Sequence, residues 1–259
     1  MNILFCINKD IFSNLAINYL IDIFKNHSCF ITMSQGVAKS NPALENLLFI
    51  ENTLPYKILF PLKISTHKKH LDFDSFIKKY NVTYLDIANI NSKDSHNILT
   101  SLKLDLIISI RYGQIFKNNS LTIAKHGILN LHSGKLPQYR GIMATFWSML
   151  HHEKTLGTTL HYINDNNIDT GDIIDIKYID FQKDKSFFWH LGKLYIKGCD
   201  TLLKTVQNIN NNAIPNTTKP INSGNYYSTP TIQDITKFYQ SGYKLYEAED
   251  IQQILKNFF

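Results

Sequence analysis

The sequence predicts an α/β protein built on an open, mostly parallel sheet, with a small α+β module at its C-terminal end. Three observations favour this fold. Through the first half of the chain, short and almost continuous apolar segments alternate with segments of helical periodicity. That alternation is typical of parallel strands that are covered by helices on both faces. After about residue 180, one long helical pattern replaces it.

Strands are expected where the apolar runs are short, at residues 3–7, 29–33, 82–85, 104–110 and 127–131. Helices are expected between them, at residues 11–25, 41–50, 72–80 and 92–103. Pro42, Asp72 and Ser92 stand where helices commonly begin. Residues 52–70 contain Pro55 and Pro61 and are expected to be irregular.

The second half predicts two further strands, at 160–163 and 173–176, joined by a polar turn over 164–172. Residues 186–209 are expected to form one long helix, and the tail is amphipathic at 232–238 and 251–259. We therefore divide the chain into a catalytic domain of residues 1–180 and a C-terminal module of residues 181–259.

The composition is that of an ordinary globular protein, with 259 residues, 44% apolar and 19% charged, which excludes wholesale disorder. The net charge of +6 permits an anionic ligand but is mild for a nucleic-acid-binding protein. Cys6, Cys29 and Cys199 show no metal-binding spacing. No apolar run approaches the ~20 residues of a membrane span, and no signal peptide is apparent. We expect a cytoplasmic protein without nucleic-acid or membrane partners.

Two glycine-rich phosphate-binding motifs are missing from the sequence. No GxGxxG follows the first predicted strand, and no GxxxxGK[ST] occurs anywhere. A dinucleotide or a nucleoside triphosphate held by such a loop is therefore not expected.

Polar residues gather at the end of the strand predicted at 127–131. Asn130 and His132 are two residues apart, so their side chains share one face of that strand. The carboxyl ends of strands in open α/β sheets are where ligands bind. The strand therefore presents an amide and an imidazole together at the mouth of an expected cleft.

The polar turn at 164–172 supplies three acidic candidates, Asp165, Asp169 and Asp172. Taken alone, this segment is simply a loop between two strands. The turn becomes informative only when it is considered together with the segment that begins at Asn130.

Together the two segments resemble the 10-formyltetrahydrofolate-dependent formyltransferases. The resemblance rests on Asn130-x-His132, Leu136-Pro137-x-Tyr139-Arg140-Gly141 and Asp169-Thr170-Gly171, and it covers roughly residues 80–180. This superfamily includes methionyl-tRNA, glycinamide ribonucleotide and sugar-nucleotide N-formyltransferases. The resemblance implies a Rossmann-like formyltransferase fold, N10-formyltetrahydrofolate as co-substrate, no metal, and Asn130, His132 and Asp169 as the catalytic trio.

Those residue types suit the implied reaction, in which a primary amine attacks the formyl carbon. Asn130 can donate a hydrogen bond to the oxyanion that develops. His132 can accept the proton of the amine near neutral pH, and Asp169 can orient His132 and stabilise its cation. Which of His132 and Asp169 receives the proton first stays open. His126, His151, His152, His161 and His190 have no such context and are expected to be structural.

The segment Ser109–Phe116 resembles the folate-binding strand and loop of the family. The pterin has an amide-like edge that matches backbone donors and acceptors. We expect it to lie against Tyr112, Gly113, Gln114, Ile115 and Phe116 on one side, and against Ile163, Asn164 and Asp165 on the other.

Chain length and the Asn225–Pro230 segment resemble the sugar N-formyltransferases. This implies a nucleotide-linked amino-dideoxysugar as acceptor, such as dTDP-4-amino-4,6-dideoxyglucose for O-antigen and lipopolysaccharide synthesis. It also implies a C-terminal β-hairpin and a homodimer. The candidates for substrate contacts are Lys9, Lys68 and Arg111 at a pyrophosphate and Tyr226 or Tyr227 on a base. The alternatives are methionyl-tRNA or glycinamide ribonucleotide as acceptor, or hydrolysis of formyltetrahydrofolate.

Overall fold

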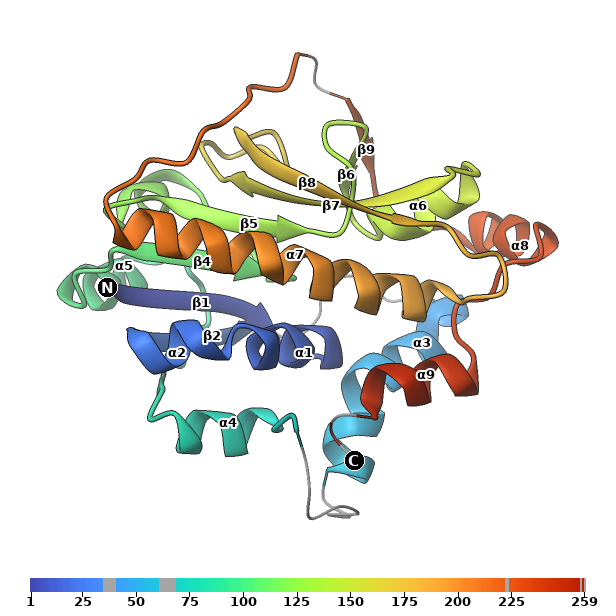
Figure 1. The fold of residues 1–259 in the computed structure, drawn as a ribbon, viewed down its shortest axis with the longest axis horizontal. Helices are drawn as coiled ribbons and strands as arrows, with labels where there is room; N and C mark the ends of the chain where they lie inside the picture. Colours follow the sequence, from blue (N-terminus) through green and yellow to red (C-terminus); the bar gives the residue numbers. More distant parts are fainter. Residues whose placement is uncertain (35–40, 61–68, 222–223, 257, 259) are drawn as a thin grey trace.

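The computed structural model describes residues 1–34, 41–60, 69–221, 224–256 and 258. Its centre is a seven-stranded sheet in the order β3-β2-β1-β4-β5-β7-β8 (Figure 1). The parallel strands are β1 (Asn2–Asn8), β2 (Ser28–Ser34), β3 (Thr83–Tyr84), β4 (Leu106–Ile110) and β5 (Ile128–His132). The antiparallel additions are β7 (Thr155–Tyr162) and β8 (Ile173–Asp180). The predicted open, mostly parallel α/β sheet is confirmed.

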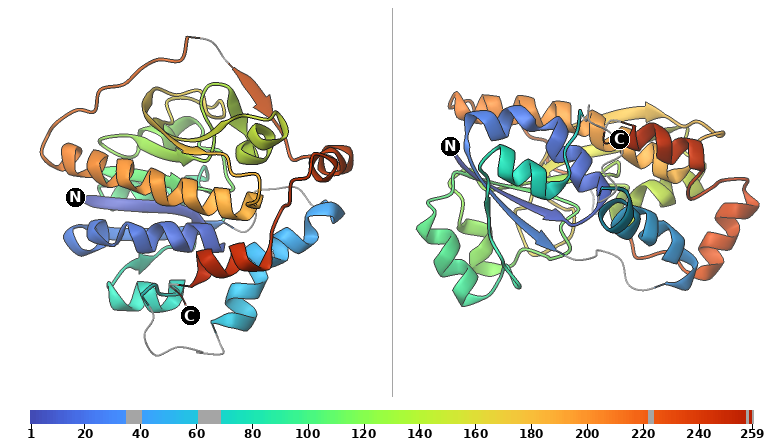
Figure 2. Two further views of the ribbon diagram at one scale, coloured as in Figure 1. Left: turned by 45° about the vertical axis from the view of Figure 1, so that its right-hand side comes forward. Right: turned by 90° about the horizontal axis from the view of Figure 1, so that it is seen from below.

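Side chains that alternate along β1 enter two hydrophobic cores, one on each face of the sheet. Ile3 and Phe5 pack in the core that α1 (Ile11–Tyr19) and α7 (Phe187–Asn210) cover. Leu4 and Cys6 pack on the opposite face, beside α5 (Lys93–Ser101). Figure 2 shows these helices on the two sides of the strands. Burial on both faces explains why the strands appear as continuous apolar runs.

The remaining helices lie around the sheet and at its carboxyl edge. They are α2 (Ile21–Asn26), η1 (Pro42–Leu44), α3 (Glu45–Leu48), η2 (Phe49–Leu59), α4 (Phe73–Lys79), η3 (Asn118–Thr122), α6 (Ala144–Leu150), α8 (Ile232–Gln240) and α9 (Ala248–Leu255). Asp72 and Ser92 cap α4 and α5 through their side chains, as the sequence indicates. Within the described residues, none of the helices has both the length and the hydropathy that a membrane span needs.

The segment around Pro55 differs from its prediction as irregular chain. Phe49–Leu59 forms the π-helix η2, which buries Ile50, Glu51 and Pro55. A tighter α-helical turn would press the Pro55 ring against the carbonyl group four residues earlier. Packing against the core thus decides the conformation of a segment whose local sequence predicts no helix. The helix predicted at 11–25 is likewise divided into α1 and α2, at Leu20.

The C-terminal part also differs in its strand pairing. In the described residues beyond 180, the strand is β9 (Asn225–Tyr227), and it pairs in parallel with β6 (Tyr139–Gly141) rather than with a neighbour in a hairpin. The helix α7 packs on α1, β7 and β8, and its apolar side chains belong to the same core as those of β1. The division at residue 180 and the dimer interface stay predictions.

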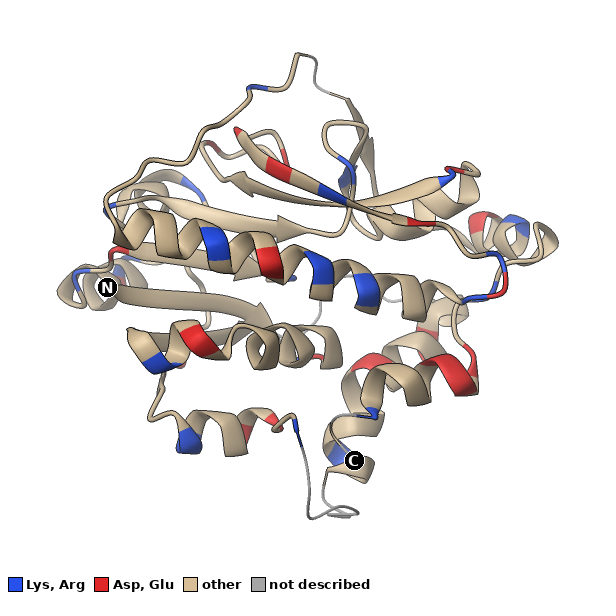
Figure 3. Cartoon of the chain, viewed as in Figure 1, with Lys and Arg blue, Asp and Glu red and all other residues tan. Residues whose placement is uncertain are grey.

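Basic and acidic residues both occur along the helix α7. Lys193, Lys197 and Lys204 of α7 are interrupted by Asp200, and Figure 3 shows basic and acidic positions mixed along the outer face of this helix.

Candidate active site

A cavity of about 370 Å³ opens at the carboxyl ends of β1, β4 and β5. Asn8 lines it from the end of β1, Arg111 from the residue after β4, and His132 from the end of β5. In the strand order, β1 and β4 mark the point where the winding of the sheet reverses. Crevices at such a switch point are where doubly wound sheets bind ligands.

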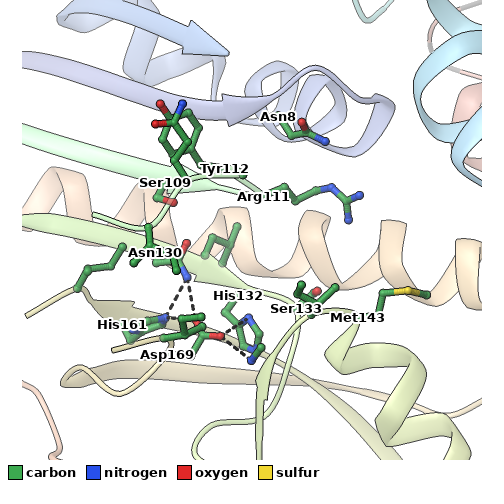
Figure 4. A pocket seen from close by; sticks show the side chains of 18 of the residues that line it. Asn8, Ser109, Arg111, Tyr112, Asn130, His132, Ser133, Met143, His161 and Asp169 are labelled. Carbon is green, nitrogen blue, oxygen red and sulfur yellow. Dashed lines mark hydrogen bonds and ion pairs between the residues drawn. The ribbon is translucent and has the colours of Figure 1, made fainter. Parts of the chain in front are cut away.

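Three side chains predicted to be catalytic meet in this cavity (Figure 4). Asn130 and His132 project from the same face of β5, and Asp169 comes from the turn between β7 and β8. Asn130 Nδ2 lies 3.3 Å from Asp169 Oδ1, and His132 Nδ1 lies 3.5 Å from Asp169 Oδ2. Two segments far apart in the sequence thus place an amide, an imidazole and a carboxylate around one point.

Asp169 is held as a carboxylate. Its backbone has φ of 55°, and its Oδ2 accepts a hydrogen bond from the Gly141 backbone N–H at 2.8 Å. Burial by itself would raise the pKa of Asp169, but the positive charge that His132 and His161 carry when protonated, together with the Gly141 N–H, outweighs it and holds that pKa well below its usual range. Asp169 is therefore an acceptor and a negative charge at neutral pH, and not a proton donor.

The orientation of His132 is fixed by a backbone carbonyl. Its Nε2 lies 2.7 Å from the carbonyl oxygen of Tyr139, which can only accept, so Nε2 carries the hydrogen. Nδ1 is then the nitrogen that faces Asp169. Gly134 lies against the ring, since a Cβ there would come within 2.5 Å of Nε2.

A second histidine completes the network, against the expectation that it is only structural. His161 Nδ1 donates to the carbonyl oxygen of Tyr162 at 2.8 Å, so the neutral ring presents Nε2 as an acceptor. This Nε2 lies 3.1 Å from Asn130 Nδ2 and 3.4 Å from Asp169 Oδ1. His161 pairs directly across from Asn130 in the β5–β7 ladder. The sequence pattern does not reveal that register, which is why the prediction missed it.

The predicted folate-binding loop lines the cavity as well. Tyr112, Gly113, Gln114, Ile115 and Phe116 all contribute to the wall, and so does Ile163. The Gln114 side chain accepts a hydrogen bond from the Ile90 backbone N–H and donates one to the Ala88 carbonyl oxygen. These bonds brace the loop, and two of its backbone groups are also bonded within the protein: the Gly113 N–H donates to Ser34 Oγ, and the Ile115 carbonyl oxygen accepts from Asn91.

Asn164 and Asp165 lie outside the described lining of the cavity. The Asp165 carboxylate accepts hydrogen bonds from the Asn167 backbone N–H and the Thr170 hydroxyl, and so shapes the turn itself. The wall beside Ile163 is formed instead by Asn167, Ile168, Thr170 and Gly171. Asn164 and Asp165 are thus not among the residues that line the cavity, and their contact with the cofactor stays a prediction.

The predicted substrate contacts divide into two groups. Arg111 and Tyr226 line the cavity, and Tyr226 is 49% exposed at its edge. Lys9 is exposed and is not among the residues that line the cavity. Lys68 belongs to the part of the chain that the structure does not describe.

Tyr227 packs away from the cavity, contrary to its prediction as a base-stacking residue. Its ring stacks on Tyr139 and Trp147, with centroid distances of 5.6 Å and 5.1 Å.

In the described part of the chain, no cluster of His, Cys, Asp and Glu has the arrangement of a metal site.

A comparison with protein families matches residues 66–187 to the formyl transferase family. Methionyl-tRNA formyltransferase from Alkaliphilus oremlandii is 31% identical over 135 residues, which are 52% of this chain and 43% of that protein. The aligned region thus spans less than half of the length of this curated relative.

Two solved structures share the fold. An N-formyltransferase from Helicobacter canadensis, in complex with folinic acid and dTDP-3-aminofucose, has a TM-score of 0.56 and 21% identity, and the match covers 90% of this chain and 71% of that one. Phosphoribosylglycinamide formyltransferase from Anaplasma phagocytophilum has a TM-score of 0.60 and 16% identity, with coverage of 88% and 99%. Residues 66–187 therefore match the formyl transferase family, and the chain has the α/β formyltransferase fold.

Proposed function

We propose that this protein transfers the formyl group of N10-formyltetrahydrofolate to the primary amine of a nucleotide-linked amino-dideoxysugar. The observation that carries the proposal is the meeting of Asn130, His132 and Asp169 in a cavity at the switch point of the sheet. The formyl transferase match over residues 66–187 supports the donor chemistry. No metal takes part in the proposed reaction.

In the proposed reaction, the amine nitrogen bonds to the formyl carbon and a tetrahedral oxyanion forms. The carbon–N10 bond then breaks, the amine loses one proton, and N10 gains one. In this structure both N–H bonds of Asn130 point at Asp169 and His161, so the oxyanion takes over one of these donors. Because an oxyanion is charged, the hydrogen bond from Asn130 is charge-assisted in the transition state.

His132 is placed to carry the proton between the two nitrogens. Its Nε2 is occupied by Tyr139, so Nδ1 accepts the proton of the attacking amine and can return it to N10. The imidazolium that forms faces Asp169, whose negative charge stabilises it. In this scheme Asp169 remains ionised throughout, consistent with its lowered pKa.

The acceptor class is supported by two features. Solved structures with this fold include sugar N-formyltransferases and an N-formyltransferase in complex with dTDP-3-aminofucose. The half-exposed ring of Tyr226 at the cavity edge offers a flat face to a nucleotide base. We propose a dTDP-linked 4-amino-4,6-dideoxyglucose, used for O-antigen or lipopolysaccharide synthesis, as the acceptor, and a homodimer as the working form.

A tRNA acceptor is the second candidate, because curated relatives at 31% and 33% identity are methionyl-tRNA formyltransferases. It predicts steeply salt-dependent affinity for tRNA. The dispersed charges of α7 in Figure 3 do not favour such a surface. Glycinamide ribonucleotide as acceptor and hydrolysis of the donor are the remaining alternatives.

One set of reactions separates these functions. The purified protein is incubated with N10-formyltetrahydrofolate and, separately, with dTDP-, UDP- and GDP-linked amino sugars, methionyl-tRNA, glycinamide ribonucleotide, or no acceptor. Mass spectrometry then reports which acceptor has exchanged an amine hydrogen for a formyl group. Formylation of an amino sugar supports the proposal. Transfer only to tRNA or the ribonucleotide contradicts it, and tetrahydrofolate formed equally without acceptor indicates a hydrolase.

A further inference from the structure

One part of the cavity lining consists of an apolar wall and a buried ion cluster. Leu44, Leu47 and Leu48 of η1 and α3 form one side, and Phe187 and Leu191 of α7 form the other. Between them stand Glu51, at the first turn of the π-helix η2, and Arg111, after β4. Long π-helical segments are rare and often occur at functional sites.

The charge of Arg111 is already compensated inside the protein. Its Nε lies 2.6 Å from Asp10 Oδ2, and its Nη2 lies 2.7 Å from Glu51 Oε2. The guanidinium also lies over the rings of Phe12 and Tyr195, at 5.3 Å and 5.8 Å from their centroids. Its backbone is held at φ of 55°. Arg111 is thus held between two carboxylates, and its side chain is fixed by them.

This arrangement does not suit a pyrophosphate at Arg111. Asp10 and Glu51 are 0% and 3% exposed, so an anion that approached the guanidinium would meet two carboxylates in a setting of low dielectric constant. Arg111 is also the one Lys or Arg among the described residues of the lining, and with both carboxylates ionised the cluster is net negative. The cluster attracts hydrogen-bond donors and repels phosphates.

Glu51 has one carboxylate oxygen left for a ligand. Arg111 binds Oε2, and no described residue forms a hydrogen bond with Oε1. The side chain is buried and lines the cavity. Burial raises the pKa of Glu51 to about 7 against the opposing effect of Arg111, so the carboxylate lacks the stabilisation that a second donor would give. An amino or hydroxyl group of a ligand would supply this donor.

We infer that Glu51, positioned by Arg111, is a specificity-determining residue that recognises a hydroxyl or amino group on the sugar ring of the acceptor. The apolar wall then takes an apolar substituent of that ring, and the phosphates stay outside this part of the cavity. The inference rests on the proposed transfer to an amino sugar. It assigns to Arg111 the positioning of Glu51 in place of pyrophosphate binding.

The test measures binding without turnover. The probe is the methyl glycoside of a 4-amino-4,6-dideoxyhexose, which has no phosphate, titrated calorimetrically into protein saturated with 5-formyltetrahydrofolate. Glu51→Gln keeps the side-chain shape and removes the charge. We expect it to weaken probe binding by about tenfold or more, since a hydrogen bond to a charged group is worth about 1.5–3 kcal/mol. Affinity for 5-formyltetrahydrofolate should not change.

Glu45→Gln is the matched control, because it removes the same charge from α3. Glu45 is exposed and is not among the described residues that line the cavity. Glu51→Asp, which retracts the carboxylate by one methylene group, serves if Glu51→Gln does not fold. Equal probe binding by wild type and Glu51→Gln overturns the inference, as does a wild type that binds no probe. A parallel loss of folate affinity would indicate a merely structural role and also overturns it.

Inorganic pyrophosphate is the opposing probe. We expect that pyrophosphate does not displace the glycoside. We also expect that its affinity for the protein is the same with Arg111 and with Lys at this position. Pyrophosphate binding that Arg111→Lys weakens would assign Arg111 to the anion and refute the inference. A wild type that binds the glycoside through Glu51 but transfers no formyl group would leave the recognition intact and defeat the proposed function instead.

Discussion

The imidazole of His132 donates from Nε2 to the carbonyl oxygen of Tyr139, 2.7 Å away, and this bond decides which ring nitrogen is left for proton transfer. The free nitrogen, Nδ1, lies 3.5 Å from Asp169 Oδ2. A negative charge beside Nδ1 stabilises the imidazolium that forms during the proposed transfer. The loop that supplies Tyr139 is therefore as much a part of the candidate site as the histidine.

Asp169→Asn should remove formyl transfer while leaving the fold intact. The amide keeps the shape of the side chain but no longer stabilises a cationic His132, so we expect kcat to fall on the order of a hundredfold or more. Steady-state kinetics and circular dichroism measure the two effects. Asp172→Asn, in the same turn but outside the described lining, is the control. Near-normal turnover by Asp169→Asn would remove the carboxylate from the proposed mechanism.

His161→Phe should lower kcat roughly tenfold to a hundredfold without a comparable change in the KM for the folate donor. The ring fills the same space but offers no acceptor to Asn130 Nδ2, which now lies 3.1 Å from His161 Nε2. The amide then loses its fixed orientation. His161→Gln restores an acceptor and should recover part of the rate. Equal rates for His161→Phe and wild type would show that Asn130 needs no such support.

Gly141→Ala should damage both stability and activity. Gly141 has φ of 96°, and an added Cβ would come within 2.2 Å of the Tyr227 carbonyl oxygen. Strain and displacement together should lower the unfolding free energy by about 2–4 kcal/mol. Gly242→Ala is a matched control, because φ there is 79° but the added Cβ meets only the Lys183 side chain at 3.9 Å. Chemical denaturation should show about 1–2 kcal/mol for it.

Tyr226→Ala should raise the KM for the nucleotide-linked acceptor by about tenfold, since stacking of a base on an aromatic ring is worth about 1–3 kcal/mol. Tyr226→Phe should retain the affinity. Tyr227→Ala should behave differently and lower the melting temperature, because Tyr227 packs between Tyr139 and Trp147. If Tyr227→Ala, and not Tyr226→Ala, weakened acceptor binding, the sites of the two rings would have to be reversed.

Glu51 should make the stability of the protein depend on pH. Burial raises its pKa from 4.5 to about 7, so the folded state binds more protons than the unfolded state between these values. The contribution of Glu51 to stability is present in full below pH 4.5 and is lost as the pH rises towards about 7. Glu51→Gln should flatten this part of the curve of melting temperature against pH. Parallel curves for the two proteins would contradict the raised pKa.

The sequence predicts the features that depend on local pattern. The strands β1, β4 and β5 are buried on both faces, so their apolar runs are visible, and period two places Asn130 beside His132. It does not predict what depends on pairing between distant segments. His161 lies beside Asn130 because of the register in which β5 pairs with β7. Glu51 contacts Arg111 because residues 49–59, which include Pro55, form the helix η2.

The parallel pairing of β9 with β6 has a consequence for how the protein is made. Tyr227 accepts a hydrogen bond from the Ile142 backbone N–H, and the ring of Tyr226 lies against Gly141, whose own N–H holds Asp169. The geometry of the carboxylate therefore depends on a segment synthesised long after the rest of the site. A nascent chain still lacking β9 would therefore hold an incomplete centre, in which Gly141 and Asp169 lack the support of Tyr226 and Tyr227.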